Sequence, residues 1–163
     1  ARSLDIGHHE VAIVGSARIG LTLSSQKGWS HFAMGHDIDV AIVSAELVNE
    51  GLDAFIRRVA DLPLKADEGA MDPAELREIQ RAARNYAAGY LSPDTFGDDD
   101  ALRQKINGAL NQVTTLLLAM TPVGPVSRLR ARVFRSWQDV ETCYTNVLRS
   151  LSRRGRTGDE DEE

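Results

Sequence analysis

The chain has 163 residues, of which 42% are hydrophobic and 26% are charged, and its formal net charge is −5. These are ordinary values for a globular protein, and the length allows one domain with a buried core. No apolar run approaches the roughly 20 residues that cross a bilayer and no signal peptide is visible, so we expect no membrane association. The single cysteine, Cys143, excludes a disulfide bond within the chain and favours the reducing cytoplasm.

Charge is unevenly distributed near the C-terminus. Residues 159–163 are all acidic, and eight arginines lie between positions 128 and 156. We therefore expect a single domain over residues 1–152, followed by a flexible tail at residues 153–163 that is first basic and then acidic. The arginines favour a basic surface that binds nucleic acid or nucleotide phosphates, although a solvated helix face explains those at positions 149–156 equally well.

Three segments have the composition of β-strands. Glu10–Val14 and Asp37–Val43 are short apolar runs with β-branched residues, and the first ends at a glycine. In Val126–Phe134, apolar residues alternate with arginines, which is typical of a strand with one buried face. The buried face would carry Leu129, Ala131 and Val133, and the opposite face Arg128, Arg130 and Arg132.

Helix signals occupy most of the remaining chain. Ser44, Asp72 and the acidic run ending at Asp100 are N-cap candidates, and Pro73 suits a first helical position. The strands and helices together predict an α+β fold, with a small mixed sheet of about three strands or more and helices packed on it. The expected helices are Ala17–Leu23, Glu46–Asp61, Glu75–Tyr90, Ala101–Met120 and Trp137–Leu151.

Asp37 and Asp39 lie two residues apart on one expected strand. Side chains at alternate residues project from the same face of a strand, about 7 Å apart at the backbone. Two such carboxylates can hold the Mg²⁺ ions that neutralise phosphate charge during phosphoryl transfer. Asp37 and Asp39 are therefore candidate catalytic residues and candidate metal ligands.

Gly15 and Ser16 follow the first expected strand. A glycine lets the main chain approach a triphosphate closely, and backbone amides at the start of a helix attract anions. The Ser16 hydroxyl can donate a hydrogen bond to a phosphate oxygen. Arg18 follows two residues after Ser16, where its side chain would either reach a phosphate or face solvent.

This order of motifs resembles the nucleotidyltransferase superfamily typified by DNA polymerase β. Gly15-Ser16 ends one strand, Asp37-Ile38-Asp39 opens the next, and the resemblance covers residues 10–44. It implies a small Mg²⁺-dependent enzyme that binds an NTP and moves a nucleotidyl group to a hydroxyl of RNA, protein or nucleotide. Compact members of this superfamily occur in toxin–antitoxin and phage-defence modules, so the resemblance implies a similar setting.

Three features depart from the pattern of the superfamily. The segment between Ser16 and Asp37 is longer than usual, and His36 precedes the first aspartate where serine is common. The superfamily usually places a third carboxylate on a later strand, whereas Val126–Phe134 contains no acid. Its arginines would bind phosphate or an acceptor. Glu10 replaces the missing acid only if its side chain shares a face with Asp37.

These departures leave a second function open. A nucleotidyltransferase fold that has lost two-metal catalysis would bind a nucleotide, a nucleic acid or a partner protein. A third option is a subunit whose catalytic acid or acceptor comes from another chain. Other phosphate motifs fit less well, because no Gly-Lys-Ser/Thr is present and the segment 15–20 lacks the middle glycine of a dinucleotide-binding fingerprint. The four histidines also lack the spacing of a metal site.

Overall fold

Four strands form one mixed sheet among the residues that this computed structural model describes. They are β1 (Val11–Val14), β2 (Ile38–Val43), β3 (Tyr90–Leu91) and β4 (Leu129–Phe134). The order is β1-β2-β4-β3; β2 and β4 are parallel, and the other two pairs are antiparallel. The described residues are 4, 6–19, 37–60, 72–96, 100–120 and 129–157.

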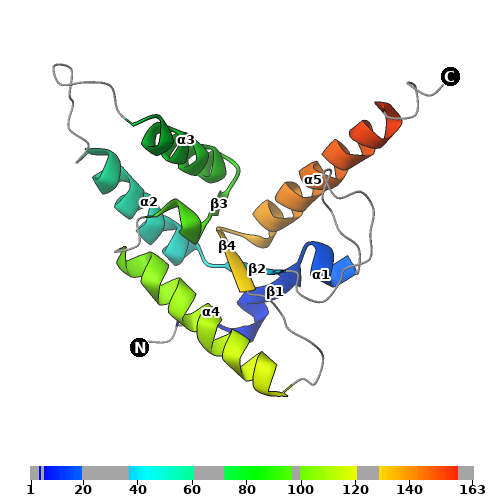
Figure 1. Cartoon of the computed structure of the whole chain (residues 1–163), viewed down its shortest axis with the longest axis horizontal. Helices are drawn as coiled ribbons and strands as arrows, with labels where there is room; N and C mark the ends of the chain where they lie inside the picture. Colours follow the sequence, from blue (N-terminus) through cyan, green and yellow to red (C-terminus); the bar gives the residue numbers. More distant parts are fainter. Residues whose placement is uncertain are drawn as a thin grey trace.

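Five helices within these ranges pack on the sheet and complete an α+β fold, which confirms the predicted fold class (Figure 1). Short 3-10 turns lie at His8–Glu10 and Pro93–Thr95. The helices are α1 (Ser16–Ile19), α2 (Ala45–Ala60), α3 (Pro73–Ala87), α4 (Ala101–Met120) and α5 (Trp137–Thr157).

The predicted N-caps form where the sequence places them. The Ser44 hydroxyl accepts a hydrogen bond from the Leu47 amide at 3.2 Å. The carboxylates of Asp72 and Asp100 accept bonds from the amides two residues later, each at 2.9 Å. Each cap satisfies a backbone amide that has no partner within its helix, so the starts of α2, α3 and α4 are set by local sequence.

The two faces of the sheet are covered by different helices (Figure 1). α2 and α4 cover the face that carries Val40, Ile42 and Val133, which we call the α4 face. α1 and α5 lie on the face that carries Ala41 and Phe134, which we call the α5 face. The alternation of apolar residues and arginines predicted for the last strand is confirmed, because Ala131 and Val133 belong to the α4 face.

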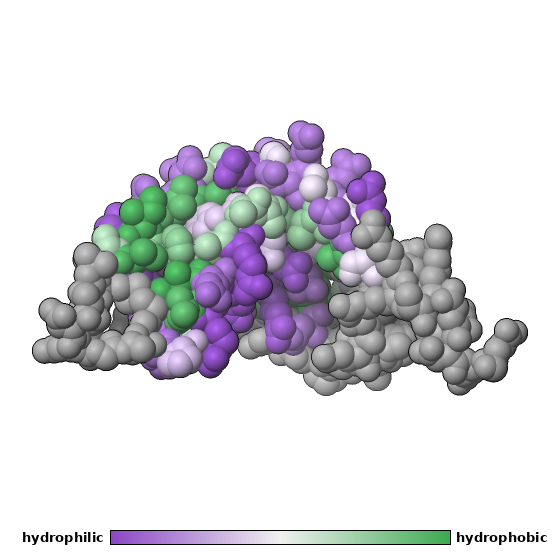
Figure 2. Space-filling model, turned by 90° about the horizontal axis from the view of Figure 1, so that it is seen from above, coloured by the Kyte–Doolittle hydropathy of each residue, from purple (hydrophilic) through white to green (hydrophobic). Residues whose placement is uncertain are grey.

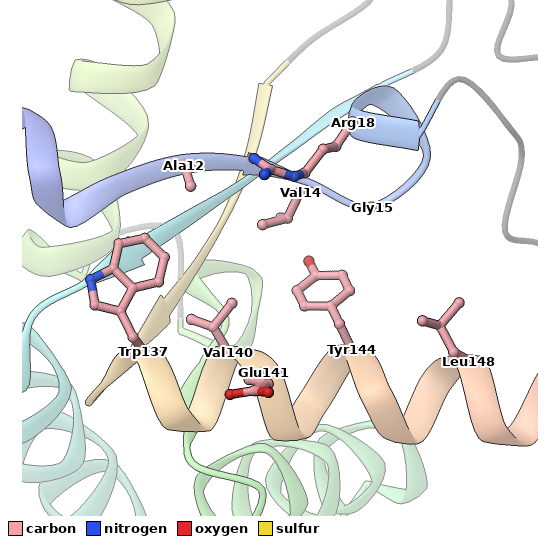
Figure 3. Close-up of a pocket in the computed structure, with 9 residues that line it drawn as sticks. All are labelled: Ala12, Val14, Gly15, Arg18, Trp137, Val140, Glu141, Tyr144 and Leu148. Carbon is pink, nitrogen blue, oxygen red and sulfur yellow. The ribbon is translucent and has the colours of Figure 1, made fainter.

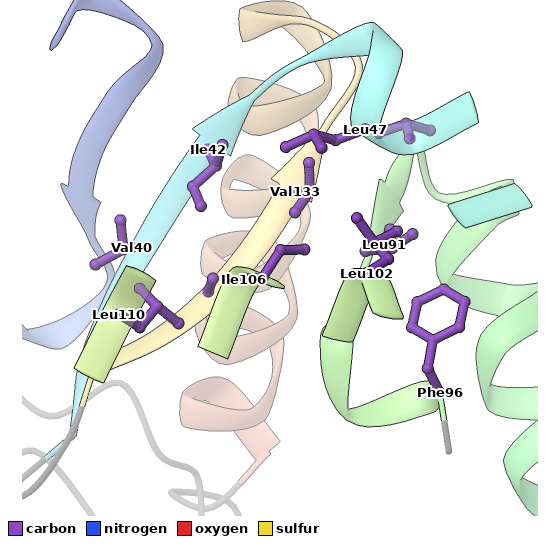
Figure 4. Packing of buried hydrophobic residues seen from close by; sticks show 11 residues of the cluster. Val40, Ile42, Leu47, Leu91, Phe96, Leu102, Ile106, Leu110 and Val133 are labelled. Atoms are coloured by element: carbon purple, nitrogen blue, oxygen red, sulfur yellow. The ribbon is translucent and has the colours of Figure 1, made fainter. Parts of the chain in front are cut away.

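The α4 face holds the larger core (Figure 4). Ile106 of α4 and Val133 of β4 are both 0% exposed. Gly51 lets α2 approach β3 closely, since a Cβ at that position would lie 1.9 Å from a methyl carbon of Leu91. The α5 face has a smaller cluster, with Val14, Ala41, Phe134 and Val140 buried.

β3 lies where the sequence predicts the end of a helix. The helix predicted over Glu75–Tyr90 ends at Ala87 instead. Gly89 then adopts a left-handed conformation with φ of +84°, which turns the chain back toward the sheet. Tyr90 pairs with Phe134 and Leu91 with Val133. The pairing partner lies more than 40 positions away in the sequence, so local patterns gave no sign of it.

The ends of two other elements differ from the prediction. α5 continues to Thr157, so its last five residues extend into the segment predicted as a flexible tail. Residues 158–163 lie outside the described residues, as do 126–128 at the start of the last predicted strand. Glu10 belongs to a 3-10 turn instead of β1, because its amide donates a hydrogen bond to the Gly7 carbonyl at 2.9 Å. Its carboxylate also accepts a hydrogen bond from the Gly7 amide at 2.6 Å.

The surface is mixed in character. Hydrophobic side chains gather on the left of the view in Figure 2, the side on which Figure 1 places α2 and α3. Ile56, Val59 and Leu76 on these two helices are exposed. No helix in the described ranges is both long enough and apolar enough to cross a membrane.

Candidate functional site

The predicted site residues converge at one end of the sheet. Val14, the last residue of β1, pairs with Asp39 near the start of β2. Asp39 in turn pairs with Arg130 near the start of β4. Gly15 directly follows Val14. Antiparallel pairing of β1 with β2 therefore brings the Gly15 turn beside Asp39, although the two residues are 24 positions apart. We call Gly15, Asp37 and Asp39 the aspartate corner.

Gly15 is conformationally required at this turn. Its φ is +66°, in the left-handed region that other residues enter at a cost of about 1–2 kcal/mol. A Cβ at this position would lie 3.0 Å from Oδ2 of Asp39. The chain then enters α1, and the Arg18 amide donates a hydrogen bond to the Gly15 carbonyl at 3.2 Å. The strand-to-helix turn predicted at Gly15-Ser16 is present, and it leaves bare backbone next to a carboxylate.

Asp37 faces an arginine of the neighbouring strand. Nε of Arg130 lies 2.6 Å from Oδ2 of Asp37, while half of the Arg130 side chain and a quarter of the Asp37 side chain are exposed. The parallel pairing of β2 with β4 places both residues on the α5 face. The arginine face of the last strand therefore meets the aspartates, and a cation already neutralises one of them.

Asp39 is the more enclosed of the two aspartates. Burial raises its pKa above the usual value, and the negative charge of Asp37 acts in the same direction. The guanidinium groups of Arg132 and Arg130 oppose the shift without cancelling it. A carboxylate in this position gains by acquiring a further positive charge, such as a metal ion.

Arg132 is held in place by aromatic rings. Its guanidinium carbon lies 5.6 Å from the centre of the Tyr90 ring and 6.0 Å from that of Tyr144, within the range of cation–π attraction. Burial raises the pKa of the nearby Cys143 thiol, and Arg132 opposes that shift. Arg132 therefore supplies fixed positive charge beside Asp39, whereas Arg130 is more exposed.

A third carboxylate does not join the aspartate corner within the described ranges, where no group of three or more His, Cys, Asp or Glu side chains gathers. Glu10 comes directly before the first residue of β1, whereas Gly15 follows the last one, so the two lie at different ends of the strand. The Glu10 carboxylate accepts a hydrogen bond from the Gly7 amide. It therefore does not replace the missing acid. Arg128 and His36 lie outside the described residues.

A cavity next to the aspartate corner was not predicted from the sequence (Figure 3). Its volume is about 470 Å³, within the range of small-molecule sites. The apolar residues of α5 were predicted only to pack on the domain, whereas in the structure Trp137 and Leu148 are about half exposed. The cavity is lined by Ala12, Val14, Gly15, Arg18, Trp137, Val140, Glu141, Tyr144 and Leu148.

Comparison of this chain with protein-family models, with curated proteins and with solved structures finds no match.

Proposed function

We propose that the protein is an Mg²⁺-dependent nucleotidyltransferase, which moves a nucleotidyl group from an NTP to a hydroxyl of RNA, protein or a nucleotide. The position of the Gly15 turn beside Asp39, set by the pairing of Val14 with Asp39, is the observation that carries the proposal. It joins backbone suited to phosphates with carboxylates suited to a metal ion, from two separate strands. Each half is a weak signal alone, and their adjacency supports a common ligand.

The residues divide into phosphate-binding and metal-binding groups. Gly15 has no side chain to keep phosphate oxygens away from the main chain, and Ser16 and Arg18 carry donors on the same turn. Asp37 and Asp39 would hold Mg²⁺, which proteins commonly bind through one or two carboxylates together with substrate phosphates. When bound, Mg²⁺ neutralises charge on the phosphates. When the nucleotide binds, Arg130 would leave its ion pair with Asp37 and bind a phosphate oxygen instead.

The reaction needs little covalent chemistry from the protein. The acceptor oxygen forms a bond to the α-phosphorus, the bond to the bridging oxygen breaks, and pyrophosphate leaves, while the hydroxyl proton passes to solvent. Positioning and positive charge account for most of the rate enhancement in such transfers. Arg130 and Arg132 supply that charge on the α5 face.

Label transfer tests this function. The protein is incubated with Mg²⁺ and each labelled NTP, against RNA, protein and nucleotide acceptors. We expect transfer by the wild type and at least a ~100-fold loss when Asp37→Asn and Asp39→Asn are combined, because the substitutions preserve shape but remove both charges. Asp53→Asn, at an exposed position of α2, is the matched control. Absence of both label transfer and NTP binding by the wild type would overturn the proposal.

The ion pair between Arg130 and Asp37 favours a second candidate function, that of a binding module without catalysis. Here the arginine takes the place of a metal ion, in keeping with the lack of a third carboxylate in the described part of the chain. A nucleotide, nucleic acid or protein would then bind in EDTA as well as in Mg²⁺. Arg130→Ala would weaken this binding, and Asp39→Asn would not.

A missing acid supplied by another chain would reconcile catalysis with this site. Size-exclusion chromatography and mixing of inactive variants test whether two chains share one site: two variants that are inactive alone would regain label transfer together.

We also propose the cytoplasmic toxin–antitoxin or phage-defence setting that the resemblance implies. Induced expression should then slow bacterial growth, and Asp37→Asn with Asp39→Asn should abolish this effect.

A further inference from the structure

The cavity of about 470 Å³ between β1 and α5, which we call the α5 cavity, has an aromatic wall. Trp137, Val140 and Tyr144 are spaced three and four residues apart, so they lie on one side of α5 and point toward β1 (Figure 3). Ala12 and Val14 form the opposite wall. The cavity is thus a gap between a strand and an aromatic helix face.

Exposure shows that the packing of this helix face is incomplete. Trp137 is 45% exposed and Leu148 is 50% exposed, whereas Val140 between them is 8% exposed. An apolar face that packed fully on the sheet would bury all three. The exposed tryptophan therefore offers a flat apolar surface beside the sheet, of the kind on which planar ligands stack.

Tyr144 adds a polar group to this wall. Its hydroxyl is buried, and no residue in the described ranges forms a hydrogen bond with it. The ring projects from α5 with the hydroxyl toward Val14 and Gly15 (Figure 3). Burial raises the pKa of Tyr144 to about 12, so the hydroxyl keeps its proton at neutral pH and can donate a hydrogen bond. A buried donor without a partner is unfavourable, and a ligand would supply the acceptor.

The α5 cavity is continuous with the proposed phosphate site. Gly15 and Arg18 line the cavity, and Val14, the residue before Gly15, pairs with Asp39 of the aspartate corner. In Figure 3 the Arg18 side chain extends along the rim above Val14. A ligand with a planar apolar end and an anionic end therefore has a surface for each, joined at Gly15.

We propose that the α5 cavity binds the base of the nucleotide whose phosphates lie at Gly15 and Arg18. Trp137 provides the stacking surface, and the Tyr144 hydroxyl donates a hydrogen bond to a ring nitrogen or carbonyl oxygen of the base. The proposal rests on the proposed function, since it assigns the second half of the NTP site. It also predicts that the protein distinguishes among bases through the buried hydroxyl of Tyr144.

Calorimetric titration with two probes separates base binding from phosphate binding. The first probe is an NTP, and all four are titrated in turn. The second probe is inorganic tripolyphosphate, and every titration contains Mg²⁺. Stacking on a protein aromatic ring contributes roughly 1–3 kcal/mol per base, so Trp137→Ala should weaken binding of the preferred NTP about 5- to 150-fold and leave tripolyphosphate binding unchanged. Tyr144→Phe should weaken it about 2- to 10-fold and narrow the differences among the four NTPs.

Two further variants serve as controls. Arg18→Ala should weaken the binding of both probes by the same factor, because Arg18 would bind the phosphates that both probes carry. Leu116→Ala truncates a side chain of α4 that is 61% exposed, and it should change neither the affinity for the NTP nor that for tripolyphosphate. Binding of tripolyphosphate by the variants also shows that they are folded.

The outcomes distinguish the base pocket from the phosphate site. If wild type binds the NTPs and tripolyphosphate equally, or if Trp137→Ala weakens both probes alike, the base pocket is overturned and the phosphate site stands. If neither probe binds wild type, the proposed function fails and the base pocket fails with it. A loss of NTP affinity alone in Trp137→Ala supports the proposal.

Discussion

The two faces of the sheet differ in what they bury. On the α4 face, Ile106 and Val133 are fully buried among apolar neighbours from every layer of the core. On the α5 face, four buried apolar residues share the surface with two aspartates and two arginines. Each face also borders a cavity, of about 470 Å³ on the α5 face and about 450 Å³ on the α4 face. Because side chains alternate along β2 and β4, one pair of strands builds both faces. Stability comes mainly from the first face, which leaves the second free to hold charge.

Truncation of the α4-face core should have the largest effect on stability. Ile106→Ala removes a fully buried side chain between α4 and the sheet and leaves a cavity, so we expect a loss of about 2–5 kcal/mol in the free energy of unfolding. Urea denaturation followed by circular dichroism measures it. Leu116→Ala, on the same helix but exposed, should stay within about 0.5 kcal/mol of wild type. Equal losses in the two variants would contradict this assignment of the core.

Substitution at the Gly15 turn should have an intermediate effect. Gly15→Ala adds a methyl group in a left-handed conformation, 3.0 Å from Oδ2 of Asp39, and should cost about 1–2 kcal/mol. The same denaturation experiment measures it, with Gly108→Ala as the control. Gly108 lies in α4 and a Cβ there meets nothing within 4 Å, so alanine should be neutral or stabilising. Similar destabilisation by both alanines would contradict the conformation assigned to Gly15.

The ion pair on the α5 face should contribute little to stability. Half of the Arg130 side chain is exposed, so a double-mutant cycle with Arg130→Met and Asp37→Asn should give a coupling energy below about 1 kcal/mol. A weak pair is what ligand binding at Asp37 requires, because the ligand must replace Arg130. A much larger coupling energy would indicate a structural role and favour the binding-module alternative.

The pH dependence of stability should report on Asp39, with a small amplitude. Burial raises its pKa in the folded protein. Its contribution is therefore most favourable below the pKa of the unfolded chain, and it declines as pH rises through the folded pKa. Relative to Asp39→Asn, wild type should lose stability as pH rises from below the ordinary aspartate pKa through the raised pKa of Asp39 in the folded protein. A gain over that interval would show that the arginines outweigh burial.

Local signals in the sequence predicted much of the fold. The caps at Ser44 and Asp72 involve residues only two or three positions apart, and the alternation in the last strand needs no partner to be recognised. β3 was missed because Tyr90–Leu91 is a strand only through its pairing with β4. α5 was predicted too short because its sequence turns polar after Leu151 while the helix continues.

The candidate site divides in the same way. The residues of the aspartate corner were selected from sequence, since Gly-Ser and Asp-x-Asp are short motifs. Their contact depends on the antiparallel register of β1 and β2, which no local pattern specifies. The α5 cavity was not predicted because an apolar stripe on a helix looks the same whether it packs fully or incompletely. The resemblance to nucleotidyltransferases remains a prediction.

The aspartate corner should bind a nucleotide through Mg²⁺. Titration of the four NTPs tests this binding, with wild type and with the double variant Asp37→Asn, Asp39→Asn, each in Mg²⁺ and in EDTA. We predict that at least one NTP binds wild type about 10-fold or more tightly in Mg²⁺ than in EDTA, and that the double variant loses this difference. NTP binding of equal strength in all four conditions, or no binding to wild type, would contradict the assignment of Asp37 and Asp39 as metal ligands.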